Sequence, residues 1–226
     1  FKIMGDLVLN HCSTRSLWFE NFKKGRDPGK DFFITVAPGA AIEQVVRPRT
    51  SELLRPTRTD LGEVLVWCTF SHDQVDLNFK NPMVLLEFLK IIHGYLERGI
   101  SWFRLDAVGF LWKELGTTCE NLPQAHTIIQ AFNRVCRIVA PAVAFKSEAI
   151  VHPDDVARYV APGECPLSYN PTLMALLWEA IATRNTKLLR QSMAHRQALP
   201  SGTTWVNYLR CHDDIGWSFD DQDARK

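Results

Sequence analysis

Short strand-like segments alternate with helical patterns along this chain, and that alternation limits its fold more than any other feature. The apolar character of buried strands occurs in five segments: 2–10, 101–107, 142–148, 166–170 and 203–211. The clearest helical pattern follows Asn81-Pro82, a capping pair, and ends at Gly99. Strands that alternate with helices pair in parallel through crossover connections. We therefore predict an α/β fold, either an open doubly wound sheet or part of a (β/α)8 barrel.

The segment 14–66 interrupts this alternation. It is rich in glycine and proline and shows no sustained periodicity, so we expect a loop-rich inserted subdomain within one catalytic domain spanning 1–226. Further helices are expected over roughly 124–139, from Pro153 onward, and over 172–197. No glycine-rich phosphate-binding loop follows any predicted strand, which disfavours the nucleotide-binding open sheet and favours the barrel.

Composition excludes several classes of function. The chain has 26 basic and 25 acidic residues, for a net charge of +1, so nothing attracts nucleic acid or an anionic membrane surface. No apolar run approaches the roughly 18 residues that span a bilayer. The six cysteines are scattered and form no CxxC pair, which favours reduced, mostly buried thiols and a cytoplasmic location. These observations leave the oligomeric state open.

Polar residues gather where four of the predicted strands end. They are Asp6, Asn10, His11, Arg104, Asp106, Glu148, His212, Asp213 and Asp214. In a barrel the carboxyl ends of the strands meet at the catalytic face. Retaining glycosyl transfer needs two carboxyl groups there, one to attack the anomeric carbon and one to protonate the leaving oxygen. A metal site is the alternative, but no pair has a recurrent ligand spacing, so we expect neither a metal nor a cofactor.

Arg104 and Asp106 interrupt an otherwise apolar strand and lie two residues apart, which places both side chains on one face. One explanation is an internal ion pair. Desolvation consumes most of the attraction between buried charges, so stability alone is a weak reason for such a pair. The other explanation is a functional site.

Four segments resemble the four signature regions of the α-amylase superfamily, glycoside hydrolase family 13. They are DLVLNH at 6–11, FRLDAVGF at 103–110, KSEA at 146–149 and RCHDD at 210–214, in family order. The resemblance implies a partial (β/α)8 TIM barrel, from about the third to the seventh strand. It also implies a fragment, whose exposed strand edges would leave it unstable or inactive alone.

Other segments point to the sucrose-using members of that superfamily. Similarity to amylosucrase is found over 112–126, 145–156 and 205–219, and similarity to sucrose phosphorylase over 47–51 and 67–82. The leading interpretation is α-retaining glucosyl transfer from sucrose to a glucan, amylosucrase-like, with release of fructose. The alternatives are transfer to phosphate, hydrolysis of sucrose or an α-glucan, and an inactive carbohydrate-binding barrel fragment.

The resemblance assigns three catalytic roles. It makes Asp106 the nucleophile, Glu148 the general acid/base, and Asp213 the group that stabilises the oxocarbenium-like transition state. Arg104 would orient Asp106 and lower its pKa, whereas the pKa of Glu148 would be raised. We expect the two reacting carboxyl groups to lie about 5–6 Å apart, as in retaining enzymes.

Substrate-binding roles follow in the same way. Alongside Arg104, the resemblance implies donor-subsite roles for His11 and His212, and places Phe70 and Gln74 near the same pocket. Arg49 would hold phosphate or a fructosyl hydroxyl in the acceptor region. Plain core packing is the alternative for Phe70, and a solvated loop position is the alternative for Arg49.

Overall fold

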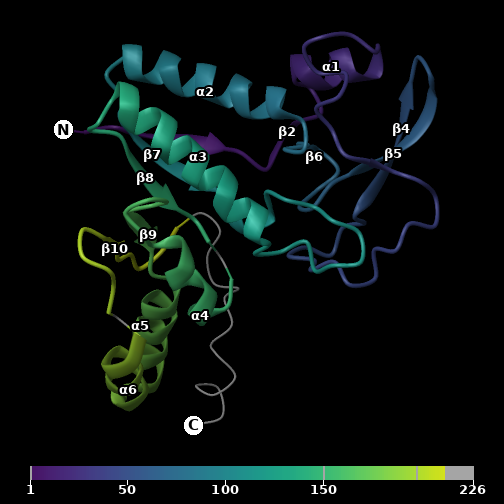
Figure 1. Ribbon diagram of the computed structural model, residues 1–226. Helices are drawn as coiled ribbons and strands as arrows, with labels where there is room; N and C mark the ends of the chain where they lie inside the picture. The colour runs from purple at the N-terminus through teal and green to yellow at the C-terminus, as the bar shows by residue number, and fades with distance from the viewer. Residues whose placement is uncertain (1, 150, 197, 212–226) are drawn as a thin grey trace.

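A five-stranded parallel sheet organises the protein, as the computed structural model shows for residues 2–149, 151–196 and 198–211 (Figure 1). Its strands are β1 (Met4–Val8), β7 (Trp102–Asp106), β8 (Ala144–Ser147), β9 (Leu167–Tyr169) and β10 (Thr204–Val206), and they follow one another in that spatial order. All four neighbouring pairs are parallel. The five predicted strands are therefore confirmed, and the α/β fold is part of a (β/α)8 barrel.

Helices connect these strands and cover the sheet. They are α2 (Pro82–Glu97), η1 (Val108–Phe110), α3 (Pro123–Val139), α4 (Pro153–Val156), η2 (Ala157–Tyr159), α5 (Pro171–Thr183) and α6 (Lys187–Arg196). The predicted cap of α2 is confirmed, because the Asn81 side chain accepts a hydrogen bond from the backbone N–H of Met83. The helical pattern over 172–197 is confirmed and forms two helices, α5 and α6, between which the chain turns at Arg184, whose φ is +56°.

Aromatic packing fixes α2 and α3 on one face of the sheet, where they run along β7 and β8 (Figure 1). Tyr95 of α2 packs edge-on against Phe103 of β7, with ring centroids 5.9 Å apart. Phe88 and Phe132 join the two helices, and Phe103 contacts Phe145 of β8. This apolar layer holds β7 and β8 together, so the polar residues of both strands face the opposite side.

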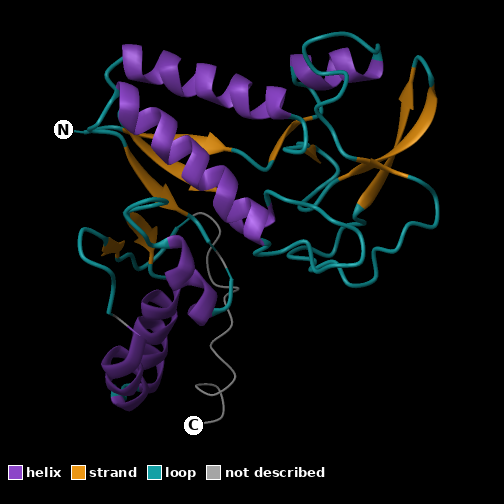
Figure 2. Cartoon of the chain, viewed as in Figure 1, coloured by secondary structure: helices purple, strands orange, loops and turns teal. Residues whose placement is uncertain are grey.

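The inserted subdomain contains more regular structure than its sequence predicted. Besides irregular chain, it holds α1 (Leu17–Lys23), β3 (Thr35–Val36), β4 (Leu54–Thr59) and β5 (Gly62–Trp67). The last three form an antiparallel sheet in the order β3-β5-β4, with the β4–β5 hairpin at one end of the molecule (Figure 2). Of the prolines and glycines that predicted loops, Pro56 lies on the edge strand β4 and Gly62 lies at the hairpin turn, where each is tolerated.

A short antiparallel pair brings the beginning of the chain next to a segment that follows the inserted subdomain. β2 (His11–Ser13) pairs with β6 (Gln74–Asp76), so that His11 lies opposite Asp76. The pair continues directly from the end of β1, so residues of both strands lie near the carboxyl ends of the parallel strands.

The expectation of mostly buried thiols is confirmed. All six cysteines lie within the described ranges, where none forms a disulfide and four are buried. Among the same residues, no helix has the length and apolar character needed to cross a membrane.

Candidate active site

Arg104 lies at the centre of a cluster of three carboxyl groups. Its Nη1 atom is 2.6 Å from Asp6 Oδ1 and 3.0 Å from Asp106 Oδ1. Its Nη2 atom is 2.5 Å from Glu148 Oε1. The strand register explains the convergence, because Arg104 of β7 is paired with Asp6 of β1, and Glu148 follows directly after β8. The structure therefore brings together three of the residues predicted for the site.

The buried Arg104 guanidinium contacts several acidic side chains, not one ion-pair partner. Its side chain is only 9% exposed, and Glu148 is similarly buried, whereas Asp6 is largely exposed. Burying a guanidinium among three carboxyl groups carries a large desolvation cost. Stability alone is therefore a weak reason for this cluster. Its guanidinium forms ion pairs with both Asp106 and Glu148 and donates a hydrogen bond to Asp6.

Asp106 differs from its sequence-based expectation in its pKa. Burial, together with the hydrogen bond and the negative charge of Glu148, raises the pKa of Asp106 to about 7. Arg104 acts to lower this pKa as expected, but it does not outweigh the other effects. The expectation of a lowered pKa for Asp106 was therefore wrong, because the sequence did not reveal how closely Glu148 approaches.

The separation of about 5–6 Å expected for the two reacting carboxyl groups stays a prediction. Asp106 and Glu148 do approach closely, since Glu148 acts on the pKa of Asp106 through a hydrogen bond and through its charge. Both contact the same guanidinium, which draws them together. A negative charge on Glu148 disfavours ionisation of the adjacent Asp106, which is one cause, after burial, of the raised pKa of Asp106.

Removing the Asp106 carboxyl group should make stability less dependent on pH. A pKa raised from 3.8 to about 7 means that the folded state keeps a proton that the unfolded chain releases near pH 4. The stabilising contribution is complete below about pH 4 and is lost as the pH rises through about 7. This contribution to the free energy of unfolding is about 4 kcal/mol. We expect urea unfolding to show Asp106→Asn gaining stability over the parent protein by up to about that amount between pH 4 and pH 8.

The control for this measurement is Asp73→Asn, which removes an exposed carboxylate outside the cluster. It corrects for the general effect of losing one negative charge. A stability difference between Asp106→Asn and the parent that stays constant across this pH range would contradict the raised pKa of Asp106.

His11, Phe70 and Gln74 form a second cluster. The Nε2 atom of His11 is 2.9 Å from the Gln74 amide, and the rings of His11 and Phe70 have centroids 5.3 Å apart. Phe70 also packs edge-on against Phe110. All three predicted pocket residues thus lie together, and Phe70 contacts both the site and its apolar surroundings.

The two clusters face a common site. Burial lowers the pKa of His11, while the carboxylates of Asp76 and Asp106 act to raise it. His11 in turn acts to lower the pKa of Asp106. A cavity of about 530 Å³ also opens beside His11 and Gln74, but Trp18 and Phe88 line its other side and the Arg104 cluster is not part of its lining.

The structure adds two buried lysines that sequence reasoning missed. Lys113 contacts Asp76 and Asn10 behind His11. Lys146 lies two residues before Glu148 on β8, and its Nζ atom is 3.5 Å from the centroid of the Tyr169 ring. Burial lowers the pKa of Lys146 to about 8. Lys146 could have been identified from the sequence, because it precedes Glu148 by two residues as Arg104 precedes Asp106. The pairing of Lys113 with Asp76 has no such local pattern in the sequence.

The backbone turns sharply just after Asp106. Ala107 has a φ of +50°, in the left-handed region that residues with a Cβ atom rarely adopt. Such a conformation costs on the order of 1 kcal/mol and is found most often at functional sites. Here it ends β7 at Asp106 and leads the chain into η1.

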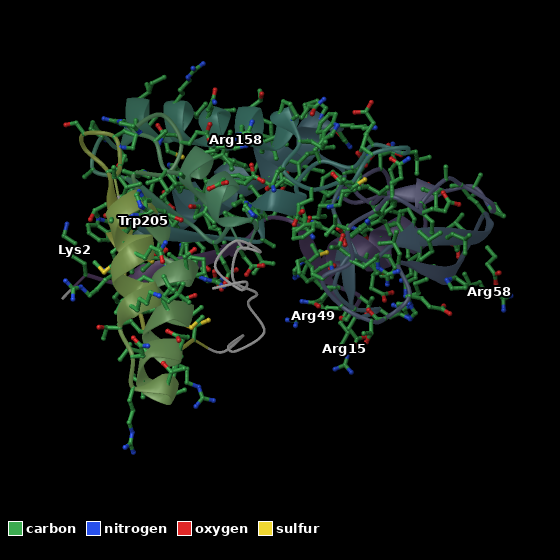
Figure 3. The ribbon with its side chains drawn as sticks, turned by 90° about the horizontal axis from the view of Figure 1, so that it is seen from below. Lys2, Arg15, Arg49, Arg58, Arg158 and Trp205 are labelled. Atoms are coloured by element: carbon green, nitrogen blue, oxygen red, sulfur yellow. The ribbon has the colours of Figure 1, made fainter. Side chains whose placement is uncertain are left out.

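Three predicted residues of the fourth motif, His212, Asp213 and Asp214, lie outside the described residues. Arg49 is described and exposed, on the inserted subdomain. In Figure 3 it lies well away from Arg58, which marks the far end of the β4–β5 hairpin. The structure therefore assembles two of the three predicted catalytic carboxyl groups.

Comparison with known proteins identifies the family of this chain. The family model described as "Alpha amylase, catalytic domain" matches residues 1–222. The chain is 40% identical over 217 residues to the glucosylglycerate phosphorylase of Spirochaeta thermophila, covering 96% of this chain and 37% of that protein. It is 42% identical over 219 residues to that of Allomeiothermus silvanus, covering 96% and 39%.

A solved structure agrees at the level of the fold. The sucrose 6F-phosphate phosphorylase of Thermoanaerobacter thermosaccharolyticum superimposes with a TM-score of 0.81 and 23% identity, over all of this chain and 49% of that one. The chain thus spans less than half the length of each of these relatives. Its match to the family model over almost its whole length shows that the chain belongs to the α-amylase catalytic-domain family.

Proposed function

We propose that the protein transfers an α-glucosyl group from a glucoside donor to inorganic phosphate, with retention of configuration. The observation that carries this proposal is the identity of 39–42% to three glucosylglycerate phosphorylases, over 95–96% of this chain. These comparisons favour the phosphate-acceptor alternative over amylosucrase-like glucan synthesis. We further propose that the donor is α-glucosylglycerate, with sucrose as the second candidate.

In the proposed first step, a carboxylate oxygen of Asp106 attacks the anomeric carbon of the donor. The bond from that carbon to the leaving oxygen breaks, and Glu148 transfers its proton to this oxygen. These roles require Asp106 to be ionised and Glu148 to be protonated when the donor binds. Asp213 would stabilise the positive charge that develops on the sugar.

In the proposed second step, a phosphate oxygen attacks the anomeric carbon of the glucosyl ester. The bond to Asp106 breaks and its electron pair returns to the carboxylate, while Glu148 takes a proton from the phosphate. Two inversions at the same carbon give α-glucose 1-phosphate. Arg104 would keep both carboxyl groups oriented throughout, through the contacts that it makes with them.

His11, Phe70 and Gln74 would form the donor subsite. The His11–Gln74 pair presents polar atoms, and Phe70 presents an apolar ring face that suits the C–H surface of a sugar. Arg49 would act on the acceptor side, where the fork of a guanidinium matches phosphate. Its exposure on the inserted subdomain is compatible with that role.

Products distinguish this proposal from its rivals. We expect the complete protein to convert α-glucosylglycerate to α-glucose 1-phosphate and glycerate, at a rate that depends on added phosphate. Parallel incubations with sucrose, with and without phosphate, test the second donor. Insoluble glucan from sucrose without phosphate would instead support the amylosucrase-like interpretation, and free glucose from both donors regardless of phosphate would indicate a hydrolase.

The acceptor role of Arg49 is tested in the same assay. Arg49→Ala should lower phosphate-dependent turnover more than hydrolysis, because only the first reaction uses the phosphate site. Arg58→Ala is the matched control, since Arg58 is also exposed on the inserted subdomain but lies at the far hairpin (Figure 3). Equal effects of the two substitutions would show that Arg49 has no acceptor role.

A further inference from the structure

Lys113 lies behind the donor subsite and is almost completely buried. Its Nζ atom is 2.6 Å from Asp76 Oδ2 and 2.5 Å from Asn10 Oδ1. An ammonium group has donors only, so both of these oxygen atoms must be acceptors. Burial lowers the pKa of Lys113, but the adjacent Asp76 carboxylate favours the charged form. Lys113 thus imposes a direction on the hydrogen bonds around it.

The amide of Asn10 cannot turn over in these surroundings. Its Oδ1 atom accepts from Lys113, and its Nδ2 atom donates to Asp76 Oδ2 at 3.0 Å. Turning the amide by 180° would place N–H against the ammonium and oxygen against the carboxylate. Asp76 is itself held in place, because it accepts from the backbone N–H and the hydroxyl of Thr69 at 2.8 and 2.7 Å.

This fixed amide determines what His11 does at its first ring nitrogen. The Nδ2 atom of Asn10 lies 3.3 Å from Nδ1 of His11, and it can only donate there. Nδ1 of His11 must therefore be the acceptor nitrogen and carry no proton. A neutral imidazole has one donor and one acceptor nitrogen, so the proton is on Nε2.

The second ring nitrogen then determines the orientation of Gln74. In the structure the amide nitrogen of Gln74 lies 2.9 Å from Nε2 of His11, and its Oε1 atom accepts from the Ser71 hydroxyl at 2.9 Å. A neutral ring cannot accept at both nitrogens, and a charged ring accepts at neither, so one of the two flanking amides must present oxygen. Asn10 is locked, and the nitrogen and oxygen of an amide are assigned from their hydrogen bonds, so the Gln74 amide must be turned by 180°, with Oε1 toward the Nε2–H group and the nitrogen toward the Ser71 hydroxyl, which can accept.

We infer that Lys113 is a positioning residue that, through Asn10, holds His11 in the tautomer with its proton on Nε2. The donor-subsite side of the ring is then a hydrogen-bond donor beside the acceptor oxygen of Gln74. A sugar hydroxyl, which both accepts and donates, matches such a pair. This inference rests on the proposed function only for the identity of that ligand.

The burial and the charges around His11 favour a neutral imidazole ring, which carries one proton. The charged groups that act on it are Asp76, Asp106 and Lys113. Burial is the largest influence and lowers the pKa of His11, and Lys113 lowers it further, against the two carboxylates. At neutral pH the ring of His11 is therefore neutral, and Asn10 determines which ring nitrogen carries the proton.

The tautomer can be measured directly in the parent protein. In the complete protein labelled with [15N]histidine, long-range 1H–15N correlation spectra distinguish a protonated from an unprotonated ring nitrogen. The His11 signals are those missing from a His11→Gln variant. We expect an unprotonated Nδ1 and a protonated Nε2. A proton on Nδ1 would overturn the inference, whatever the enzymatic activity of the protein.

Two variants test whether Lys113 and Asn10 cause this choice. Asn10→Asp replaces the donor at Nδ1 with an acceptor oxygen, and the proton should move from Nε2 to Nδ1. Asp76→Asn combined with Lys113→Met removes the ammonium and its buried partner together, so that neither charge is left unpaired. Without these two charges the Asn10 amide can turn over, and the Nε2-protonated tautomer of His11 should no longer predominate.

Lys146→Met is the matched control, because it also removes a buried ammonium but one that lies beside Tyr169 instead of Asn10. It should leave the His11 tautomer unchanged. An unchanged tautomer in Asn10→Asp, or an equal change in Lys146→Met, would overturn the inference. Asn10→Asp is nearly the same size as the parent residue and keeps the test decisive if the double variant does not fold. The readout is independent of turnover, so it remains valid if the proposed phosphate acceptor is wrong.

Discussion

Replacing Asp106 with asparagine is expected to reduce kcat by about 10⁴–10⁶-fold, the range found when a catalytic nucleophile is removed. An amide nitrogen or oxygen cannot form the glucosyl ester through which the proposed reaction proceeds. The fold should remain intact, because an asparagine side chain still fits the space, and the substitution removes a buried group whose ionisation is unfavourable in the folded state. Steady-state production of glucose 1-phosphate measures the loss, and circular dichroism confirms folding.

Asp6→Asn is the matched control for this prediction. Asp6 contacts the same guanidinium as Asp106, at 2.6 Å, but its side chain is 55% exposed. Removing its charge tests whether any loss at the Arg104 cluster abolishes turnover. We expect a far smaller reduction than for Asp106→Asn, and equal losses would show that the cluster acts only through its overall charge.

Replacing Glu148 with glutamine is expected to separate two kinds of donor. General acid catalysis contributes about 10²–10⁴-fold to rates, and a glycerate or fructose leaving group needs its proton. Fluoride leaves without protonation, so the first step with α-glucosyl fluoride should survive the substitution. Adding azide, an anion that attacks without losing a proton, should then restore turnover and give α-glucosyl azide. Release of fluoride and formation of the azide are both measured.

The control for Glu148→Gln is Glu120→Gln, which removes a half-buried carboxyl group outside the Arg104 cluster. It should affect both donors equally and only slightly. If Glu148→Gln lowered turnover of natural donor and glucosyl fluoride by the same factor, with no recovery in azide, Glu148 would bind substrate without transferring a proton.

The parallel sheet could be predicted because local patterns determine it. The five strands are short apolar runs, and capping pairs such as Asn81-Pro82 mark where helices begin. The β4–β5 hairpin was missed for a physical reason. Its strands belong to a small antiparallel sheet with a core of its own around Trp67. Prolines and glycines in such a segment are as typical of loops as of edge strands.

The residues of the site were largely predictable, but their protonation was not. Arg104, Asp106 and Glu148 could be assigned because polar residues interrupted apolar strands and resembled known motifs. The pKa of Asp106 depends on its burial and on the approach of Glu148, which follows another strand, and no local pattern encodes either of these. The same holds for Lys113, after η1, and Asp76, on β6, which are far apart in the sequence and meet only in the folded chain.

The most direct test of glucosyl transfer through Asp106 is to trap the intermediate. A fluoroglucosyl fluoride should inactivate the complete protein by forming an ester that is hydrolysed slowly, because fluorine on the ring destabilises the oxocarbenium-like transition state. Mass spectrometry of protein digests should then place one fluoroglucosyl group on Asp106, and added phosphate should release it faster than water does. A label on Glu148 or Asp213, or inactivation with no covalent label, would contradict the assignment of Asp106 as the nucleophile.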